Sequence, residues 1–206
     1  MGACPTLTTA RLILRPFVES DLDGFTEIFL SPEVHAALHL PASFSRADAW
    51  SGMVAWLGQW ELRGTGQWAV VTKADGTLVG RAGLHRPERP DWPGIEVGWV
   101  LDPRQWGHGY ATEAGTCAVA YVFEEIGADE VFSVILPENR RSEAVATRLG
   151  FTLVEQRVMS HFPESPHGIW RLGRDEWESR RSSSPHPGGD QRRWSPPSTS
   201  TTSPVT

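Results

Sequence analysis

A glycine-containing turn in the second half of the chain carries the strongest chemical signal. A candidate strand enters it, and the sequence Trp106-Gly107-His108-Gly109 is followed by a helix start at Tyr110. Glycines let the backbone approach a ligand closely. The first amides of a helix are unpaired donors at the positive end of its dipole. The turn therefore predicts a site for a pyrophosphate group.

A dinucleotide-binding turn is the main alternative for a Gly-x-Gly sequence at a helix start. That motif belongs to an early strand–helix–strand unit, with an acidic residue about twenty positions on, at the end of the second strand. Here the turn follows four candidate strands, and Asp129 and Glu130 precede the next strand instead of ending it. The pattern disfavours an enzyme that uses nicotinamide or flavin.

The N-terminal half predicts the first elements that must support this turn. Alternation predicts a short strand at 11–16, helical spacing follows Ser20, and 31–44 is expected to be a loop. A second helix is expected to begin at Ser45 with Asp48 as its capping partner. The face expected to be buried on this helix contains Trp50, Met53, Leu57 and Trp60, while Trp56 lies off that stripe and is expected to line a groove.

The rest of the chain alternates strands with helices. Asp75-Gly76 is a strong hairpin signal between strands at 67–73 and 78–85. Further strands are expected at 95–101, 131–136, 151–158 and 168–173, and helices at 109–126 and 139–149. This order predicts an α/β fold with a mixed sheet.

Composition excludes several classes of protein. The 19 basic and 25 acidic residues give a net charge of −6, which disfavours a dedicated nucleic-acid-binding domain. Two cysteines are too few for a disulfide framework or a cysteine-based zinc site, so no metal is expected. No apolar run reaches the roughly 20 residues that a membrane span needs. The first residues show neither a basic leader nor an apolar stretch, so we expect a cytoplasmic protein without a membrane partner.

The last 28 residues, 179–206, differ from the rest of the chain. Nineteen of them are Ser, Pro, Thr or Gly, and no apolar period is present. Such a segment buries too little surface to offset the entropy of ordering it. We therefore expect a folded domain at 1–178 and a disordered Ser/Pro/Thr-rich tail at 179–206.

Three separated motifs together resemble the GNAT superfamily of N-acetyltransferases. They are the run from Trp106 to Ala114, the pair Asn139-Arg140-Arg141-Ser142 and Arg148-Leu149-Gly150-Phe151, and the opening 8–16. Within this superfamily, the motifs most resemble the branch that contains the RimJ/RimL-type ribosomal-protein N-terminal acetyltransferases. It implies a GNAT-like α/β fold with a mixed, mostly antiparallel sheet, flanked by about four helices, and a splay between the fourth and fifth strands. Residues 1–178 would then be an acetyl-CoA-dependent N-acetyltransferase domain.

The resemblance also implies how acetyl-CoA would be held. Backbone groups around Val100 and Leu101 would hold the thioester and pantetheine arm, and Asn139 would hydrogen-bond the arm. The pyrophosphate would lie on amides from Gly107, His108, Gly109, Tyr110, Ala111 and Thr112. The family pattern Q/R-x-x-G-x-G/A matches as Trp106-x-x-Gly109-x-Ala111, with Trp in the first position. A second register, Arg104-x-x-Gly107-x-Gly109, matches every letter of the pattern, but it leaves residues 110–114 out of line with the branch, so we prefer the first register.

Acetyl transfer to an amine requires a base for the amine and an acid for the thiolate. Glu96 is the candidate base, near the position where several relatives keep a glutamate; period-two alternation places it opposite Val97 and Trp99. Many superfamily members place a tyrosine, as the acid, at the position occupied here by Ala146. Ser142 or water would have to replace it.

The sequence leaves three possible functions, which differ in the acceptor of the acetyl group. The first and favoured one is acetylation of a protein or peptide N-terminal amine; the second is acetylation of a small-molecule amine such as an antibiotic or metabolite. The third is a non-catalytic acyl-CoA-binding module. Glu33, Asp48, Glu88 and Asp91 are expected to attract a cationic amine to the acceptor groove. The resemblance is compatible with a homodimer and does not set the oligomeric state.

Overall fold

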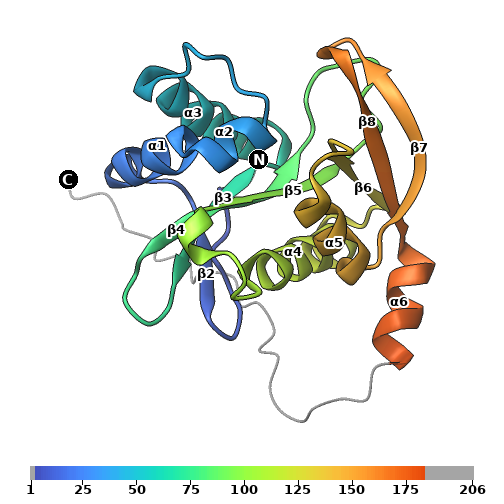
Figure 1. Cartoon of the computed structure of the whole chain (residues 1–206). Coiled ribbons are helices and arrows are strands. Elements are labelled where there is room, and N and C mark those ends of the chain that lie inside the picture. The colour runs from blue at the N-terminus through green and yellow to red at the C-terminus, as the bar shows by residue number, and fades with distance from the viewer. Residues whose placement is uncertain (1–2, 184–206) are drawn as a thin grey trace, which may run out of the picture.

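The computed structural model describes residues 3–183 of the 206-residue chain. Two strands, three α-helices and three strands follow one another in the first half, and strands then alternate with helices from residue 96 to residue 159 (Figure 1). The strands are β1 (Leu7–Thr8), β2 (Leu12–Arg15), β3 (Gln67–Thr72), β4 (Leu78–His85), β5 (Glu96–Leu101), β6 (Glu130–Ile135), β7 (Thr152–Met159) and β8 (Phe162–Gly173). The α-helices are α1 (Leu22–Leu30), α2 (Pro32–Ala37), α3 (Arg46–Arg63), α4 (Tyr110–Tyr121), α5 (Arg140–Leu149) and α6 (Arg174–Ser183). Two 3-10 turns, η1 (Glu19–Asp21) and η2 (Pro103–Gln105), and a π-helical segment, η3 (Val122–Ile126), complete the described elements.

All eight strands form one sheet in the order β1-β2-β3-β4-β5-β6-β8-β7. Neighbouring strands run antiparallel except β5 and β6, which are parallel. The parallel pair is in register at one position only, Glu96 opposite Phe132, so β5 and β6 separate toward Leu101 and Ile135. The mixed, mostly antiparallel sheet and the splay between the fourth and fifth predicted strands are confirmed.

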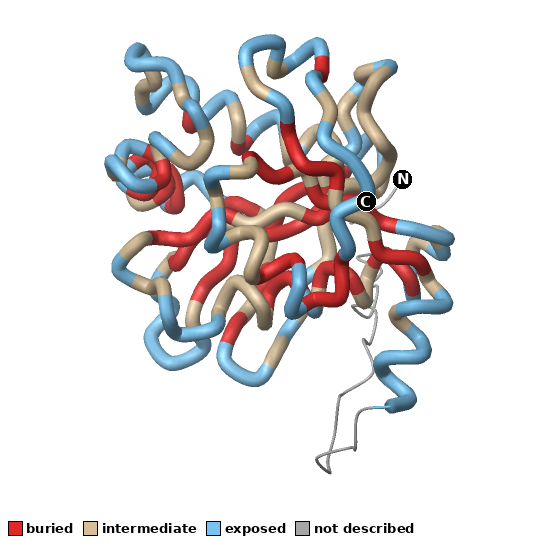
Figure 2. The backbone as a smooth tube through the Cα atoms, turned by 45° about the vertical axis from the view of Figure 1, so that its right-hand side comes forward, coloured by how far each residue is buried: buried red, intermediate tan, exposed pale blue. Residues whose placement is uncertain are grey.

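Helices cover both faces of the sheet (Figure 1). Helices α1 and α3 pack with Phe25, Phe29 and Met53 against Ala69 and Val100 on one face. Helices α4 and α5 cover the other face, in a second apolar cluster that includes Val97, Ala118, Val131 and Leu149. The buried backbone accordingly concentrates in the centre of the sheet (Figure 2). Apolar clusters on the two faces hold the strands rigidly on either side of the splay.

Local sequence signals start several elements where they were predicted. The Asp48 carboxylate accepts a hydrogen bond from the Ser45 backbone N–H at 2.9 Å, and α3 begins directly after Ser45. The Asn139 side chain accepts from the Ser142 N–H at 3.1 Å, and α5 begins at Arg140. Each signal acts within four residues, so it needs no tertiary context.

The predicted buried face of α3 is wrong in part. Trp50 is 53% exposed and Leu57 36% exposed, whereas Met53 and Trp60 are buried. Trp56 packs against the α1 cluster, because α3 turns the stripe that contains Ala49, Met53 and Trp56 toward α1. As expected, Trp56 also lines a pocket. Both stripes are helical in spacing, and tertiary contacts select between them: α1 covers Met53, while Trp60 packs on Trp68 and Tyr121.

The expected loop at 31–44 contains a short helix, α2. Pro32 occupies its first turn, where a missing N–H costs nothing and the ring fixes a helical φ. Val34 of this helix is buried against α1. Tertiary contact therefore stabilises a helix too short for periodicity to predict.

Helix α6 (Arg174–Ser183) continues across the expected domain boundary at residue 178. Helix α6 runs to Ser183, and Trp177 packs on Phe123 with ring centroids 5.0 Å apart. Arg181 lies 4.6 Å from the Trp177 ring and forms an ion pair with Glu124. The polar residues 179–183 thus continue a helix whose first turns are held on the domain by Trp177. The rest of the predicted tail, 184–206, lies outside the described residues.

Across residues 3–183, no helix combines the length and the apolar composition required to cross a membrane.

Candidate active site

A cleft of about 1200 Å³ opens where β5 and β6 separate. Its walls are the end of β5, the glycine turn, the first turns of α4 and α5, and part of α2. Within residues 3–183, the edge of β5 that faces β6 has no strand partner beyond Glu96. Unpaired backbone groups at the edge of such a gap can hydrogen-bond an extended ligand.

The glycine turn forms the far end of this cleft. Gly107 has a φ of 82° and Gly109 a φ of 78°, left-handed conformations that favour glycine. Gly109 is the N-cap of α4 and contributes no side-chain cap, so the first amides of the helix stay available to a ligand. This geometry suits a phosphate-bearing group.

A carboxylate clamp holds this turn from behind. Glu113 accepts hydrogen bonds from the Thr9 hydroxyl at 2.6 Å, from the Arg11 backbone N–H at 2.8 Å and from Arg11 Nε at 2.7 Å. Arg11 Nη1 also donates to the His108 carbonyl at 2.9 Å. Burial opposes ionisation of Glu113, but the bonds from Thr9 and Arg11 outweigh it and keep the pKa of this carboxyl below its usual value. The clamp thus joins the opening motif to the glycine motif, a link that sequence analysis missed.

Trp106, which replaces the family's Gln or Arg, is built into the cleft wall. Its Nε1 donates to the Leu101 carbonyl at 2.9 Å. The guanidinium of Arg141 lies 4.3 Å from the centre of the Trp106 ring. Arg140, Arg141 and Arg148 all line the cleft and supply positive charge on the α5 side. The motif Asn139-Arg140-Arg141-Ser142 carried this information, but only the fold places its arginines beside the glycine turn.

Most residues predicted to bind acetyl-CoA line this cleft. They are Val100, Leu101, Gly107, Gly109, Tyr110, Ala111, Thr112 and Asn139. His108 is the exception among the predicted set: it is exposed, its Nδ1 is 3.1 Å from the Gln105 carbonyl, and its ring stacks on Tyr110. The His108 carbonyl contributes instead to the clamp through Arg11.

A second, smaller pocket adjoins the cleft through shared wall residues. It measures about 240 Å³ and shares Val100, Leu136, Asn139 and Ser142 with the cleft. Glu96 lies in this pocket, with Oε2 3.3 Å from His85 Nδ1. The side chains of Glu96 and His85 are 13% and 27% exposed. We call this space the acceptor pocket, because a molecule in it would meet the end of a ligand held along β5.

The acid candidate Ser142 belongs to both cavities. Its N–H is used by the Asn139 cap, and the residue lines the cleft and the acceptor pocket at their junction. Ala146 is completely buried in the core, so no polar group replaces the family's tyrosine at that position. The structure brings Glu96 and Ser142 to the same pocket from β5 and α5.

The four carboxylates that were expected to make the acceptor groove acidic do not line the acceptor pocket. Asp48 caps α3, Glu88 pairs with Arg63, and Asp91 accepts from the Ser160 hydroxyl at 3.0 Å. Glu33 lines the cleft instead. Each of these four carboxylates either has a partner within the protein or lies outside the acceptor pocket. Glu96 is the acidic side chain that lines this pocket.

Histidines and aromatic rings form the outer wall of the acceptor pocket. His161 and His167, from the β7–β8 hairpin, line it together with Trp92 and Phe162. Burial is the main cause that lowers the pKa of both histidines. These rings are therefore mainly neutral near pH 7. His39 lines the cleft, while His35 Nε2 is 3.1 Å from the Pro41 carbonyl.

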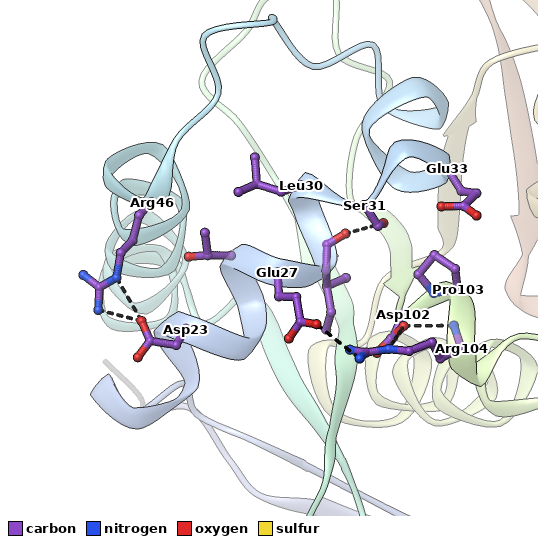
Figure 3. A pocket seen from close by; sticks show the side chains of 11 residues that line it. Asp23, Glu27, Leu30, Ser31, Glu33, Arg46, Asp102, Pro103 and Arg104 are labelled. Carbon is purple, nitrogen blue, oxygen red and sulfur yellow. Dashed lines mark hydrogen bonds and ion pairs between the residues drawn. The ribbon is translucent and has the colours of Figure 1, made fainter.

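A third hollow, of about 660 Å³, lies between α1, α2 and η2 (Figure 3). Its charged residues largely neutralise one another: Arg46 pairs with Asp23, and Arg104 pairs with both Glu27 and Asp102. The Arg104 pairs tie α1 to the turn that leads into Trp106. We assign this hollow a supporting role only.

The cleft residues suit acetyl-CoA in three respects. The glycine turn and the α5 arginines can hold phosphates, the splayed β5 edge can hold an amide-containing arm, and the arm's end reaches the acceptor pocket. Within residues 3–183, no cluster of three or more His, Cys, Asp or Glu side chains could hold a metal ion.

Comparison with known proteins agrees with this geometry. Residues 11–152 match the family model for the acetyltransferase (GNAT) domain. The chain is 30% identical over 208 residues to a protein of Aspergillus fumigatus named FsC-acetyl coenzyme A-N(2)-transacetylase, covering 94% of this chain and 85% of the relative. It is 28% identical over 149 residues to the uncharacterised N-acetyltransferase YoaA of Bacillus subtilis, covering 71% and 82%.

Among solved structures, an acetyltransferase from Agrobacterium tumefaciens superposes with a TM-score of 0.72 at 30% identity. That superposition covers 84% of this chain and 97% of the other. Family model, sequence relatives and fold lead to one conclusion. The chain belongs to the GNAT family of N-acetyltransferases, which use acetyl-CoA.

Proposed function

We propose that this enzyme transfers the acetyl group of acetyl-CoA to a primary amine bound in the acceptor pocket. The observation that carries the proposal is the position of Glu96, in a pocket that meets the cleft at the strand splay. Acetyl-CoA would contact the β5 edge at Val100 and Leu101, Asn139, and the turn from Gly107 to Thr112. Arg141 on Trp106 would replace the charge that the family's first motif position supplies.

In this mechanism Glu96 takes a proton from the acceptor amine. The amine nitrogen then forms a bond to the acetyl carbon, and the carbon–sulfur bond breaks with its electron pair leaving on sulfur. Ser142 relays a proton from solvent water to the thiolate and ends the step as a hydroxyl, or water at the same junction donates the proton directly. His85, 3.3 Å from Glu96, orients the carboxylate and can take its proton onward.

The acceptor pocket supports a small amine as the acceptor. A volume of about 240 Å³, enclosed by Trp56, Trp92 and Phe162, holds a small molecule or a single residue. The name of the Aspergillus relative specifies transfer to an N(2) atom. The protein or peptide N-terminal amine, favoured by the resemblance to the RimJ/RimL-type branch, is the competing acceptor.

An amine panel tests the proposal. The full chain would be incubated with labelled acetyl-CoA and small amines, free peptides or N-terminally blocked peptides. We expect label on small amines. Label on free peptides alone would favour the N-terminal acceptor. Tight acetyl-CoA binding without label on any amine would instead support the non-catalytic acyl-CoA-binding module and contradict the proposal.

A further inference from the structure

One cationic side chain in the acceptor pocket has no role in the chemistry proposed above. Arg81, on β4, lines the pocket with Trp56 and Gln67. Its Nη1 donates to Gln67 Oε1 at 2.9 Å, while its Nε is completely buried and has no hydrogen-bond partner among residues 3–183. A buried donor without a partner is costly and points to a missing acceptor.

Aromatic rings hold this guanidinium in place. Its central carbon lies 4.8 Å from the Trp56 ring and 5.7 Å from the Phe29 ring. Stacking on ring faces leaves the edge of a guanidinium, where its N–H groups point, free for hydrogen bonds. Arg81 is therefore positioned by side chains that do not neutralise it.

No carboxylate within residues 3–183 forms an ion pair with Arg81, whereas many other arginines have such a partner. Burial lowers the pKa of Arg81 to about 10, and the charge of Glu96 partly offsets this. The guanidinium stays cationic at neutral pH. Its positive charge is thus only weakly compensated by the protein.

The register of β4 and β5 places Arg81 and Glu96 on one face of the sheet. Arg81 is opposite Val100, and His85 is opposite Glu96. Between these pairs lie Gly83 and Gly98, which have no side chains. A Cβ at Gly98 would be 3.6 Å from Glu96 Oε1, so the carboxylate leans over this gap. The floor of the acceptor pocket therefore has the cationic Arg81 at one end and the anionic Glu96 at the other.

The charged residues of the whole pocket favour a ligand that carries negative charge. Arg81 and Arg89 line it, against the single carboxylate of Glu96. His161 and His167 are mainly neutral, because burial lowers the pKa of each. A simple cationic amine would neutralise Glu96 but would leave Arg81 uncompensated, whereas Arg89 is also close to the charge of Asp91.

From this arrangement we infer that the acceptor is a small amino acid, whose carboxylate binds Arg81 while its amine lies at Glu96. The carboxylate would accept hydrogen bonds from the part of the guanidinium edge that lines the pocket. The inference rests on the proposed function and narrows it from primary amines to amines that also carry a carboxylate.

The test compares each amino-acid acceptor with the analogue in which an uncharged carboxamide replaces the carboxylate. Wild-type enzyme would be assayed with α- and ω-amino acids and with the corresponding carboxamides. We expect kcat/KM to be at least tenfold higher for carboxylates, because a charge-assisted pair is lost in the amide. Equal kcat/KM for the two series, or acetylation of peptides alone, would overturn the inference while leaving acetyl transfer itself established. An enzyme that labels no amine would instead contradict the proposed function.

Variants of Arg81 separate recognition from structure. Arg81→Met keeps apolar bulk and should bring the carboxylate-to-carboxamide ratio close to one, mainly through KM, while Arg81→Lys should keep part of the preference. The matched control, Arg46→Met, removes an exposed arginine from outside the pocket and should leave the ratio unchanged. A purely structural role would lower both series equally, and that result would overturn the inference. If Arg81→Met does not fold, the carboxylate-to-carboxamide ratio of kcat/KM in the wild type and in Arg81→Lys still tests the inference.

Discussion

The carboxylate of Glu96 illustrates how single residues acquire a chemical role in this protein. It lies on the strand that opens the splay, beside His85 and at the pocket floor formed by Gly98. Ser142 approaches the same pocket from α5. The proposed base and acid therefore lie on separate rigid elements on either side of the place where acetyl-CoA and amine would meet.

Replacing Glu96 by Gln tests its role as the base. The change keeps size and hydrogen bonding but removes the proton acceptor, so turnover should fall by roughly 10²–10⁴. Acetyl-CoA affinity should stay nearly unchanged. Part of the lost turnover should return as the pH rises, because the amine then loses its proton to solvent. Steady-state kinetics across pH checks this, with Glu61→Gln on the exposed side of α3 as the control. Near-wild-type turnover at neutral pH would exclude Glu96 as the base.

Gly109→Val tests the phosphate turn. A β-branched residue at a φ of 78° would force the turn out of its left-handed conformation and misalign the amides of α4. Calorimetry should show at least a tenfold loss of acetyl-CoA affinity. Gly127→Val is a matched control, because Gly127 has a φ of 76° and is absent from the cleft lining. Equal effects of the two variants on affinity would mean that strain, not the site, explains the loss.

Between elements, the Glu113 clamp has the clearest mechanical role. It fastens the segment before β2 to the first turn of α4, using Thr9 and Arg11. On the other side of the turn, Arg104 connects α1 to η2 through ion pairs with Glu27 and Asp102 (Figure 3). The glycine turn is thus held by two separate polar contacts, which keep its amides aligned without a bound ligand.

Glu113→Gln should destabilise the fold by about 1–3 kcal/mol at pH 7, because bonds from Thr9 and Arg11 to a charged acceptor are weakened. The folded-state pKa of Glu113 lies below its ordinary value of 4.5. Its stabilising contribution is therefore present above pH 4.5 and is lost as the pH falls through the folded-state pKa. Denaturant unfolding at several pH values should show the wild type and the variant converging in acid.

Glu130→Gln provides the comparison for this experiment. Its ion pair with Arg171 is largely exposed, at 46% and 37% of the two side chains, so its loss should cost under about 1 kcal/mol. A clamp variant no less stable than this control would show that Glu113 does not stabilise the turn.

At the scale of the whole molecule, α6 packs over η3, the segment that follows α4. Arg174 Nη2 donates to the carbonyls of Phe123 and Ala128 at 2.8 and 2.7 Å, and Trp177 packs on Phe123. These contacts cover the end of α4 and η3, which belong to the core cluster beneath the sheet. We propose that the folded domain extends through α6 and that the remainder of the chain adds no stability.

Trp177→Ala should lower the Tm by several degrees, because about 1 kcal/mol corresponds to roughly 2–4 °C in a domain of this size. Truncation after Ser183 should leave the Tm unchanged. Differential scanning calorimetry of the two proteins checks both expectations. A large drop on truncation after Ser183, or none for Trp177→Ala, would place the domain boundary elsewhere.

The sequence by itself determined the features that act over a few residues. The turn at Gly107 and Gly109, the cap at Asn139 and the capped start of α3 depend on local hydrogen bonds and backbone preferences. Alternation along β5 was enough to place Glu96 opposite Val97 and Trp99. These signals predicted an α/β fold with a mixed sheet, and the family resemblance carried by three motifs added the strand splay at which the cleft opens.

Only the tertiary structure decided which distant residues meet. Glu113 contacts Thr9 across 104 positions, and Arg81 shares a pocket with Glu96 because β4 and β5 pair in one particular register. The buried stripe of α3 and the course of α6 were likewise chosen by neighbours, α1 and η3. Such choices depend on long-range packing, which no local pattern encodes, because the free energy that selects them arises only when the sheet brings both partners together.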